Sequence, residues 1–145
     1  MAITVQGFDK LEVKFDSIPN EARAELRKEL NGVAFSVRGY IVKKLRNLTG
    51  SKTVERYDPT RTVRVSAYGS YPNSDRGNLI KRLGIGKARS KNKGSKTGGI
   101  VAEIISGAEY SEELDKTRPF LSRAVWAKRK YIESRIRAAI KRSTK

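Results

Sequence analysis

Two chemically active residue types are missing from this 145-residue sequence, which contains no cysteine and no histidine. Their absence excludes disulfide bonds, thiol nucleophiles, imidazole acid–base catalysis and zinc sites built from the usual ligands. The remaining serines, lysines, tyrosines and carboxylates form no nucleophile elbow, phosphate-binding loop or paired-acid motif, and Gly84-x-Gly86 lacks the rest of a dinucleotide fingerprint. We therefore expect a protein that is not an enzyme and that needs no cofactor or metal.

Long hydrophobic runs are also absent. No segment reaches the roughly 20 apolar residues that a membrane-spanning helix needs, and the first eight residues lack the basic start and apolar stretch of a signal peptide. We expect a soluble chain that is made in the cytoplasm. With 37% hydrophobic residues, the chain is long enough for one core and too short for two, which predicts a single domain over residues 1–145.

Acidic residues are scarce beside the basic ones. The 15 Asp and Glu residues face 32 Lys and Arg residues, and the net charge is +17. Solubility alone does not require so large an excess, so the charge indicates an anionic partner. Nucleic acid, an acidic membrane surface and an acidic protein ring would each satisfy it, because the charge sets the sign of the partner and not its identity.

Two long helices are predicted, over residues 18–48 and 118–142. In the first, apolar residues recur at spacings of three and four, which is the pattern of a helix with one buried face. In the second, an apolar side is surrounded by basic residues, so we expect an amphipathic helix whose charged side is either solvated or a contact surface for a neighbouring protein.

The segments around the first helix are less regular. Residues 1–17 predict an N-terminal arm or edge strand. Residues 51–78 are rich in Thr, Ser, Gly, Pro and Asp and predict a long loop that either packs on a neighbouring subunit or contains short elements. Three tyrosines fall in this segment, and such residues anchor loops or protein interfaces more often than they stack on nucleic-acid bases: Tyr57, Tyr68 and Tyr71.

A basic β-hairpin is predicted over residues 79–107. Its strands, at 79–86 and 99–107, carry apolar faces bounded by glycine. The tip, residues 87–98, is either a solvated loop or a finger that orders against DNA or an acidic neighbour. Its cations are the candidate contacts for such a partner: Lys87, Arg89, Lys91, Lys93 and Lys96. The expected fold class is α+β, with two long helices packed on a small, mainly antiparallel sheet that carries an extended basic hairpin loop.

A turn followed by a helix is predicted around Pro119. Proline has a fixed φ and no amide hydrogen, so it favours the first turn of a helix and an extended residue before it. We expect Thr117 or a neighbouring turn residue to cap this helix, and Phe120 and Leu121 to begin its buried face. Arg118 is expected to reach back to an acidic side chain: Glu112, Glu113 or Asp115.

The order of short motifs along the chain resembles a known family. Tyr110 and an acidic pair precede Leu114, and a short turn leads to the tetrapeptide Arg118-Pro119-Phe120-Leu121 and a closing helix. This block is similar to one in the HK97 gp10-like family of tailed-phage neck and tail-completion proteins, and the resemblance covers roughly residues 5–140.

A second block upstream is similar to the same family. Residues 66–72 match a Ser-Ala-x-Gly-x-x-Pro loop that includes Gly69 and Pro72. The step into the next strand follows with Gly77 and Leu79, where Arg76 stands in place of the threonine common in relatives. The resemblance implies that the residues of both blocks shape the subunit and its interface with neighbouring copies.

The resemblance also implies a function. Proteins of this family are virion structural subunits that form rings between the head and the tail, so the expected partners are copies of this chain, portal, adaptor or head-closure proteins, tail tube proteins and channel DNA. The expected location is the neck or tail of a virion assembled in the host cytoplasm, with no membrane partner. The alternative is a small basic DNA- or RNA-binding protein, although the usual reading motifs of that class are missing.

Overall fold

The computed structural model describes residues 2–6, 10–15, 20–47, 50, 52–57, 60–73, 77–90 and 98–143. The fold of these residues is α+β, as predicted. The elements in chain order are β1 (Ala2–Gln6), β2 (Lys10–Phe15), α1 (Asn20–Arg46), β3 (Thr53–Tyr57), β4 (Thr60–Arg64), α2 (Asn78–Lys81), β5 (Leu83–Ser90), β6 (Gly98–Ser106), α3 (Ser111–Thr117), α4 (Leu121–Ala127) and α5 (Arg129–Ser143).

The main sheet has four strands in the order β1-β2-β6-β5, and every neighbouring pair is antiparallel. The predicted N-terminal arm or strand is thus a hairpin, whose second strand pairs with β6 and leaves β1 at the edge. The opposite edge strand, β5, has a bulge between Gly86 and Arg89. Within this bulge the amide of Ala88 donates to Asn31 Oδ1 of α1 at 2.8 Å, so the irregular part of β5 is tied to the helix that covers it.

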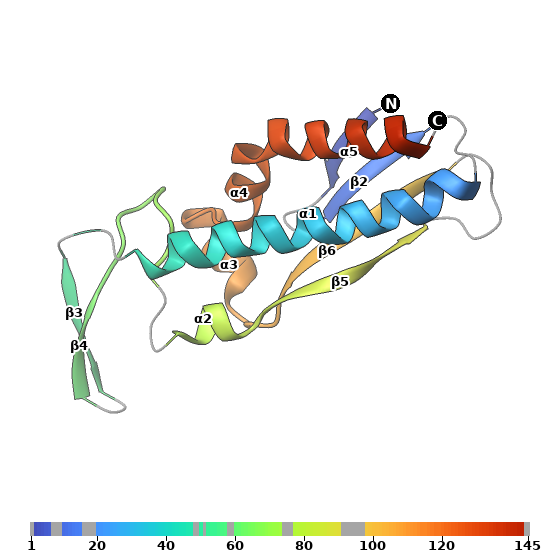
Figure 1. Cartoon of the computed structure of the whole chain (residues 1–145). Helices are drawn as coiled ribbons and strands as arrows, with labels where there is room; N and C mark the ends of the chain where they lie inside the picture. The colour runs from blue at the N-terminus through green and yellow to red at the C-terminus, as the bar shows by residue number, and fades with distance from the viewer. Residues whose placement is uncertain are drawn as a thin grey trace.

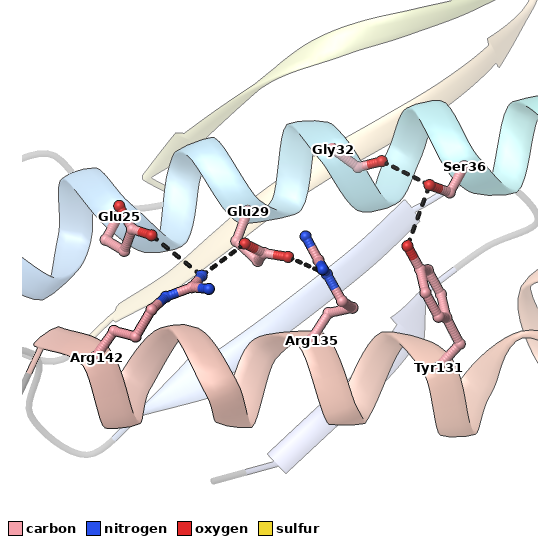
Figure 2. Close-up of polar contacts among 7 residues, drawn as sticks. All are labelled: Glu25, Glu29, Gly32, Ser36, Tyr131, Arg135 and Arg142. Carbon is pink, nitrogen blue, oxygen red and sulfur yellow. Dashed lines mark hydrogen bonds and ion pairs between the residues drawn. The ribbon is translucent and has the colours of Figure 1, made fainter.

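The helices α1 and α5 lie on the same face of this sheet (Figures 1 and 2). α1 packs against β5 and β6 and runs alongside α5. Its apolar stripe, predicted from spacings of three and four, is buried, and the hydrophobic residues that it contributes to the core are Ala22, Leu26, Leu30, Val33, Ala34, Val37, Ile41 and Leu45. Burial of this stripe is what makes a helix of this length stable, because most helical stability in proteins comes from packing of one face.

Polar contacts join α1 to α5 along their length (Figure 2). Glu29 is only 7% exposed, and its two carboxylate oxygens accept from Arg135 Nε and Arg142 Nη2. Further along, the hydroxyls of Ser36 and Tyr131 lie 3.3 Å apart. The arginine side chains remain half-exposed, so the pairs combine one buried charge with two that keep contact with water.

Residues 51–78, predicted as a long loop that either packs on a neighbouring subunit or contains short elements, contain a β-hairpin. β3 and β4 pair antiparallel from Thr53 opposite Arg64 to Tyr57 opposite Thr60. The side chains of β4 alternate between exposed and half-exposed, and none is buried. The described side chains of this hairpin lie outside the core. Strand-like alternation in the sequence covers only residues 62–67, so composition makes most of the segment look like a loop.

Two other predicted boundaries are wrong. Leu79 lies in the short helix α2 and not in a strand, and β5 begins only at Leu83. The predicted helix over residues 118–142 is divided at Lys128 into α4 and α5, and the acidic segment before it forms the extra helix α3. Each of these short helices buries one to three side chains, too few to produce a clear helical period.

Candidate assembly surface

A buried carboxylate organises the turn between α3 and α4. Asp115 is 2% exposed, and its Oδ1 accepts hydrogen bonds from the amides of Phe120 at 2.7 Å and Leu121 at 2.9 Å. Its Oδ2 accepts from Ser122 Oγ at 3.3 Å. Of the predicted cap, Thr117 or a neighbouring turn residue, the structure shows Asp115 in that role, whereas the Thr117 hydroxyl donates to the carbonyl of Leu114. A carboxylate suits this place because it only accepts hydrogen bonds and because its charge complements the positive end of a helix.

The loop of residues 65–73 is fastened to this turn by three hydrogen bonds. Arg118 Nε donates to the carbonyl of Ser66 at 3.2 Å, so its predicted pairing with Glu112, Glu113 or Asp115 is wrong. The amide of Gly69 donates to the carbonyl of Thr117 at 3.1 Å. Arg123 Nη1 donates to the carbonyl of Gly69 at 2.7 Å. The loop of residues 65–73 and the segment around Arg118 thus meet in space, although about fifty residues separate them along the chain.

The residues predicted to form a subunit interface have two different environments. Four of them are buried within this chain: Pro72, Leu79, Phe120 and Leu121. These four side chains belong to the interior of this chain, and their predicted role in an interface between copies stays a prediction. The others reach the surface to different degrees: Gly69, Gly77, Tyr110, Leu114, Arg118 and Pro119.

Among these surface positions, Tyr110 presents the largest apolar side chain, with 51% of its area exposed. It precedes α3 and lines a shallow pocket of about 180 Å³ together with Asn78, Arg82 and Glu109. Ligand pockets for drug-sized molecules usually measure about 300–1,000 Å³. The hollow is therefore smaller than a usual pocket for a drug-sized ligand.

The hairpin formed by β3 and β4, residues 53–64, is hereafter called the arm. It is a separate two-stranded sheet, and no described side chain of it belongs to the core cluster. Figure 1 shows it projecting from the end of the molecule where α1 ends. An isolated two-stranded hairpin is at best marginally stable in water. Packing on another surface would therefore stabilise the arm.

The base of the arm is held by backbone geometry. The amide of Val65 donates to the carbonyl of Lys52 at 2.8 Å, and Asn73 Nδ2 donates to the carbonyl of Arg64 at 2.9 Å. Gly50, just before the arm, has a φ of 82°, and a Cβ atom at this position would collide with the carbonyl oxygen of Val65. These contacts set the direction in which the arm leaves the body of the protein.

The predicted basic tip lies partly outside the described residues. The backbones of Lys87 and Arg89 form part of β5, whereas Lys91, Lys93 and Lys96 fall in a segment that the structure does not describe. β5 ends and β6 begins at the end of the molecule opposite the arm (Figure 1). The two hairpins therefore extend toward opposite ends of the subunit.

The tyrosines of residues 51–78 have different environments. Tyr68 is 79% exposed, whereas Tyr71 packs against the core cluster and meets the Tyr40 ring edge-on at 6.4 Å between centroids. Burial raises the pKa of the Tyr71 hydroxyl well above its ordinary value. Tyr71 therefore anchors its loop, as the interface or anchor interpretation allowed, and the side chain of Tyr57 lies outside the described residues.

In the part of the chain that the structure describes, no cluster of acidic side chains could hold a metal ion. None of the described helices is both long and apolar enough to cross a bilayer. Comparisons with known proteins found no matching family model, no matching curated protein and no matching solved structure.

Proposed function

We propose that this chain is a virion structural subunit of the head–tail connector of a tailed phage, and that copies of it form a ring around the DNA channel. The observation that carries the proposal is the packing of loop 65–73 against the turn between α3 and α4 through Arg118, Gly69 and Arg123. The two sequence blocks in which we find the family resemblance pack against each other. This packing gives a physical reason for both to occur in one chain.

The arm supports the assembly part of the proposal. A subunit that forms a ring needs a feature that reaches beyond its own core, and the arm does so with polar strands and exposed edges. The arm contacts other copies of this chain. Portal, adaptor, head-closure or tail tube proteins contact the two ends of the ring. The net charge of +17 suits a channel through which DNA passes.

The oligomeric state after nuclease treatment tests this function. Light scattering of the purified chain should give one defined mass of several subunits, and negative-stain images should show closed rings. A variant in which a short Gly-Ser linker replaces residues 53–64 should be monomeric while its circular dichroism and melting temperature remain close to those of the parent. A parent protein that stays monomeric at every concentration would contradict the ring.

A point variant makes the same test without shortening the chain. Val54 and Val63 are cross-strand partners in the arm and are half-exposed, so Val54→Asp with Val63→Asp should weaken the assembly. Phe35→Ser, which removes an exposed apolar side chain from the outer side of α1, is the matched control and should leave the mass unchanged. The alternative, a small basic nucleic-acid-binding protein, predicts a monomer whose association disappears with nuclease.

A further inference from the structure

We propose that Lys44, Arg123 and Lys128, supported by the rings of Tyr40 and Tyr71, form a site for backbone phosphates of duplex DNA. This group of five residues is hereafter called the cation cluster. It goes beyond the proposed function because a single subunit contains the whole site, so it requires no ring.

The geometry brings three cations from separate parts of the chain to two neighbouring rings. Lys44 Nζ lies 5.5 Å from the ring centre of Tyr40 and 5.9 Å from that of Tyr71. Lys128 Nζ lies 4.7 Å from the ring centre of Tyr40, and Arg123 Cζ lies 5.2 Å from that of Tyr71. Each contact is within the roughly 6 Å at which a cation is attracted to the face of an aromatic ring.

These positions are fixed by the fold and not by chance encounters of flexible side chains. Tyr40 and Lys44 are four residues apart on α1, so they share one side of that helix. Arg123 is held by its hydrogen bond to the carbonyl of Gly69, and Lys128 occupies the break between α4 and α5. Side chains that are restricted before binding lose less entropy when a ligand arrives.

The positive charge of the cluster is not neutralised within the described residues. None of its three cations forms an ion pair with a described carboxylate, whereas Arg129, Arg135 and Arg142 of α5 each do. Tyr71 adds no negative charge, because a tyrosine hydroxyl is protonated at neutral pH. Three like charges held close together without an internal counter-ion favour an external anion.

The chemistry of the cluster fits phosphate better than a single carboxylate. The guanidinium of Arg123 presents a planar set of donors, of which one is used on Gly69, and such forks match phosphate oxygens. The ammonium groups of Lys44 and Lys128 are point charges that tolerate several approach directions. One carboxylate would offset only one of the three charges, whereas the DNA backbone supplies a regular row of them.

Salt dependence of DNA binding tests the site. Each phosphate contact contributes about 0.9 to the slope of log K against log salt concentration. Lys44→Gln with Arg123→Gln and Lys128→Gln should therefore reduce the slope for a fluorescent duplex by about 2 to 3. The control is Lys28→Gln with Lys130→Gln and Arg137→Gln, which removes the same charges from exposed positions on α1 and α5, and it should reduce the slope by less than about 1.

Two further variants distinguish loss of the phosphate contacts from loss of the folded structure. Lys44→Arg with Arg123→Lys and Lys128→Arg retains the charge and should restore most of the slope. Lys128→Gln alone, at the helix break, should reduce the slope by about 1. Melting temperatures of all variants show whether a change in binding reflects a change in folding.

Several outcomes would overturn the proposal. Equal slopes for the cluster and control triples would show that only the total charge matters. Loss of binding to polyglutamate in the cluster triple, with an unchanged slope for DNA, would assign the site to an acidic protein. Displacement of DNA by inorganic phosphate, beyond the effect of sodium chloride at equal ionic strength, would show that the cluster takes a free phosphate ion. None of these results depends on whether the chain forms a ring.

Discussion

Removal of the Asp115 carboxylate should destabilise the protein far more than removal of any nearby acidic group. Asp115 is the cap of α4 and satisfies two backbone amides and one hydroxyl in a buried turn. Because the loop of residues 65–73 is hydrogen-bonded to the same turn, removal of the Asp115 carboxylate should also loosen the hydrogen bond from Arg118 to the Ser66 carbonyl. The informative perturbations are Asp115→Ala, which removes every acceptor, and Asp115→Asn, which keeps one oxygen.

The magnitude follows from these bonds. Loss of a capping side chain costs about 0.5–2 kcal/mol, and a buried amide left without a partner costs about 1–3 kcal/mol. Since these costs overlap, Asp115→Ala should lower the free energy of unfolding by about 3 kcal/mol, and Asp115→Asn by about 1 kcal/mol. For a chain of this size, 1 kcal/mol corresponds to roughly 2–4 °C, so the alanine variant should melt about 6–12 °C below the parent.

Urea titration followed by circular dichroism measures the effect, with thermal melting as a second readout. The matched control is Glu113→Ala, which removes an exposed carboxylate from the same helix and breaks its pair with Lys116. That control should cost less than about 0.5 kcal/mol, as exposed pairs do. If Asp115→Ala costs no more than the control, or if Asp115→Asn costs as much as Asp115→Ala, the capping role is refuted.

Three further perturbations have defined outcomes. Glu29→Gln should lower the free energy of unfolding by about 1–2 kcal/mol, because two half-exposed arginines of α5 lose their buried anionic partner. Urea titrations at low and high salt should show a smaller loss of stability at high salt. A loss of stability that salt does not change would argue against an ionic origin. Burial raises the pKa of Tyr71 above its ordinary value, so the unfolded chain releases this proton at a lower pH than the folded chain, and stability falls as the pH rises above about 10. Tyr71→Phe should therefore lose less stability between neutral and alkaline pH than the parent, and parallel curves for the two proteins would refute the assignment. Gly50→Ala should cost at least about 1–3 kcal/mol, because its φ of 82° is unfavourable for alanine and the new methyl group meets a backbone carbonyl; a neutral result in urea titration would show that the base of the arm can shift.

The fold class and the longest helix were predictable because burial leaves a period in the sequence. α1 contributes eight hydrophobic residues to the core, and spacings of three and four repeat over its length. The β5–β6 hairpin was predictable for a related reason, since glycines bound its apolar segments. Leu79 was misplaced because one buried leucine in a four-residue helix fits a strand equally well.

The arm and the short C-terminal helices were not predictable in the same way. The described side chains of the arm are not part of the core, and strand-like alternation in the sequence covers only residues 62–67, which does not mark both strands of the arm. Lys128 is neither glycine nor proline, and nothing local marks it as the break between α4 and α5. The break follows from packing of α4 against α1 and of α5 along it.

The candidate site depends mainly on contacts between distant residues. Phe120 and Leu121 were correctly placed at the start of a buried face, because proline and two large apolar residues leave few alternatives. The partner of Arg118 was missed because it is a backbone carbonyl, and any residue type can supply one. The cation cluster joins positions 40, 44, 71, 123 and 128, and no short window of sequence contains more than two of them.

The independence of the arm from the core has a consequence for how this chain can change. Substitutions of the described side chains of the arm leave the buried hydrophobic cluster untouched, so the energetic penalty that limits mutation in the core hardly applies to them. Length and surface chemistry of this projection can drift, or be redesigned by grafting, while the remainder folds as before. Variation of that kind would let one scaffold acquire new binding partners without a new fold.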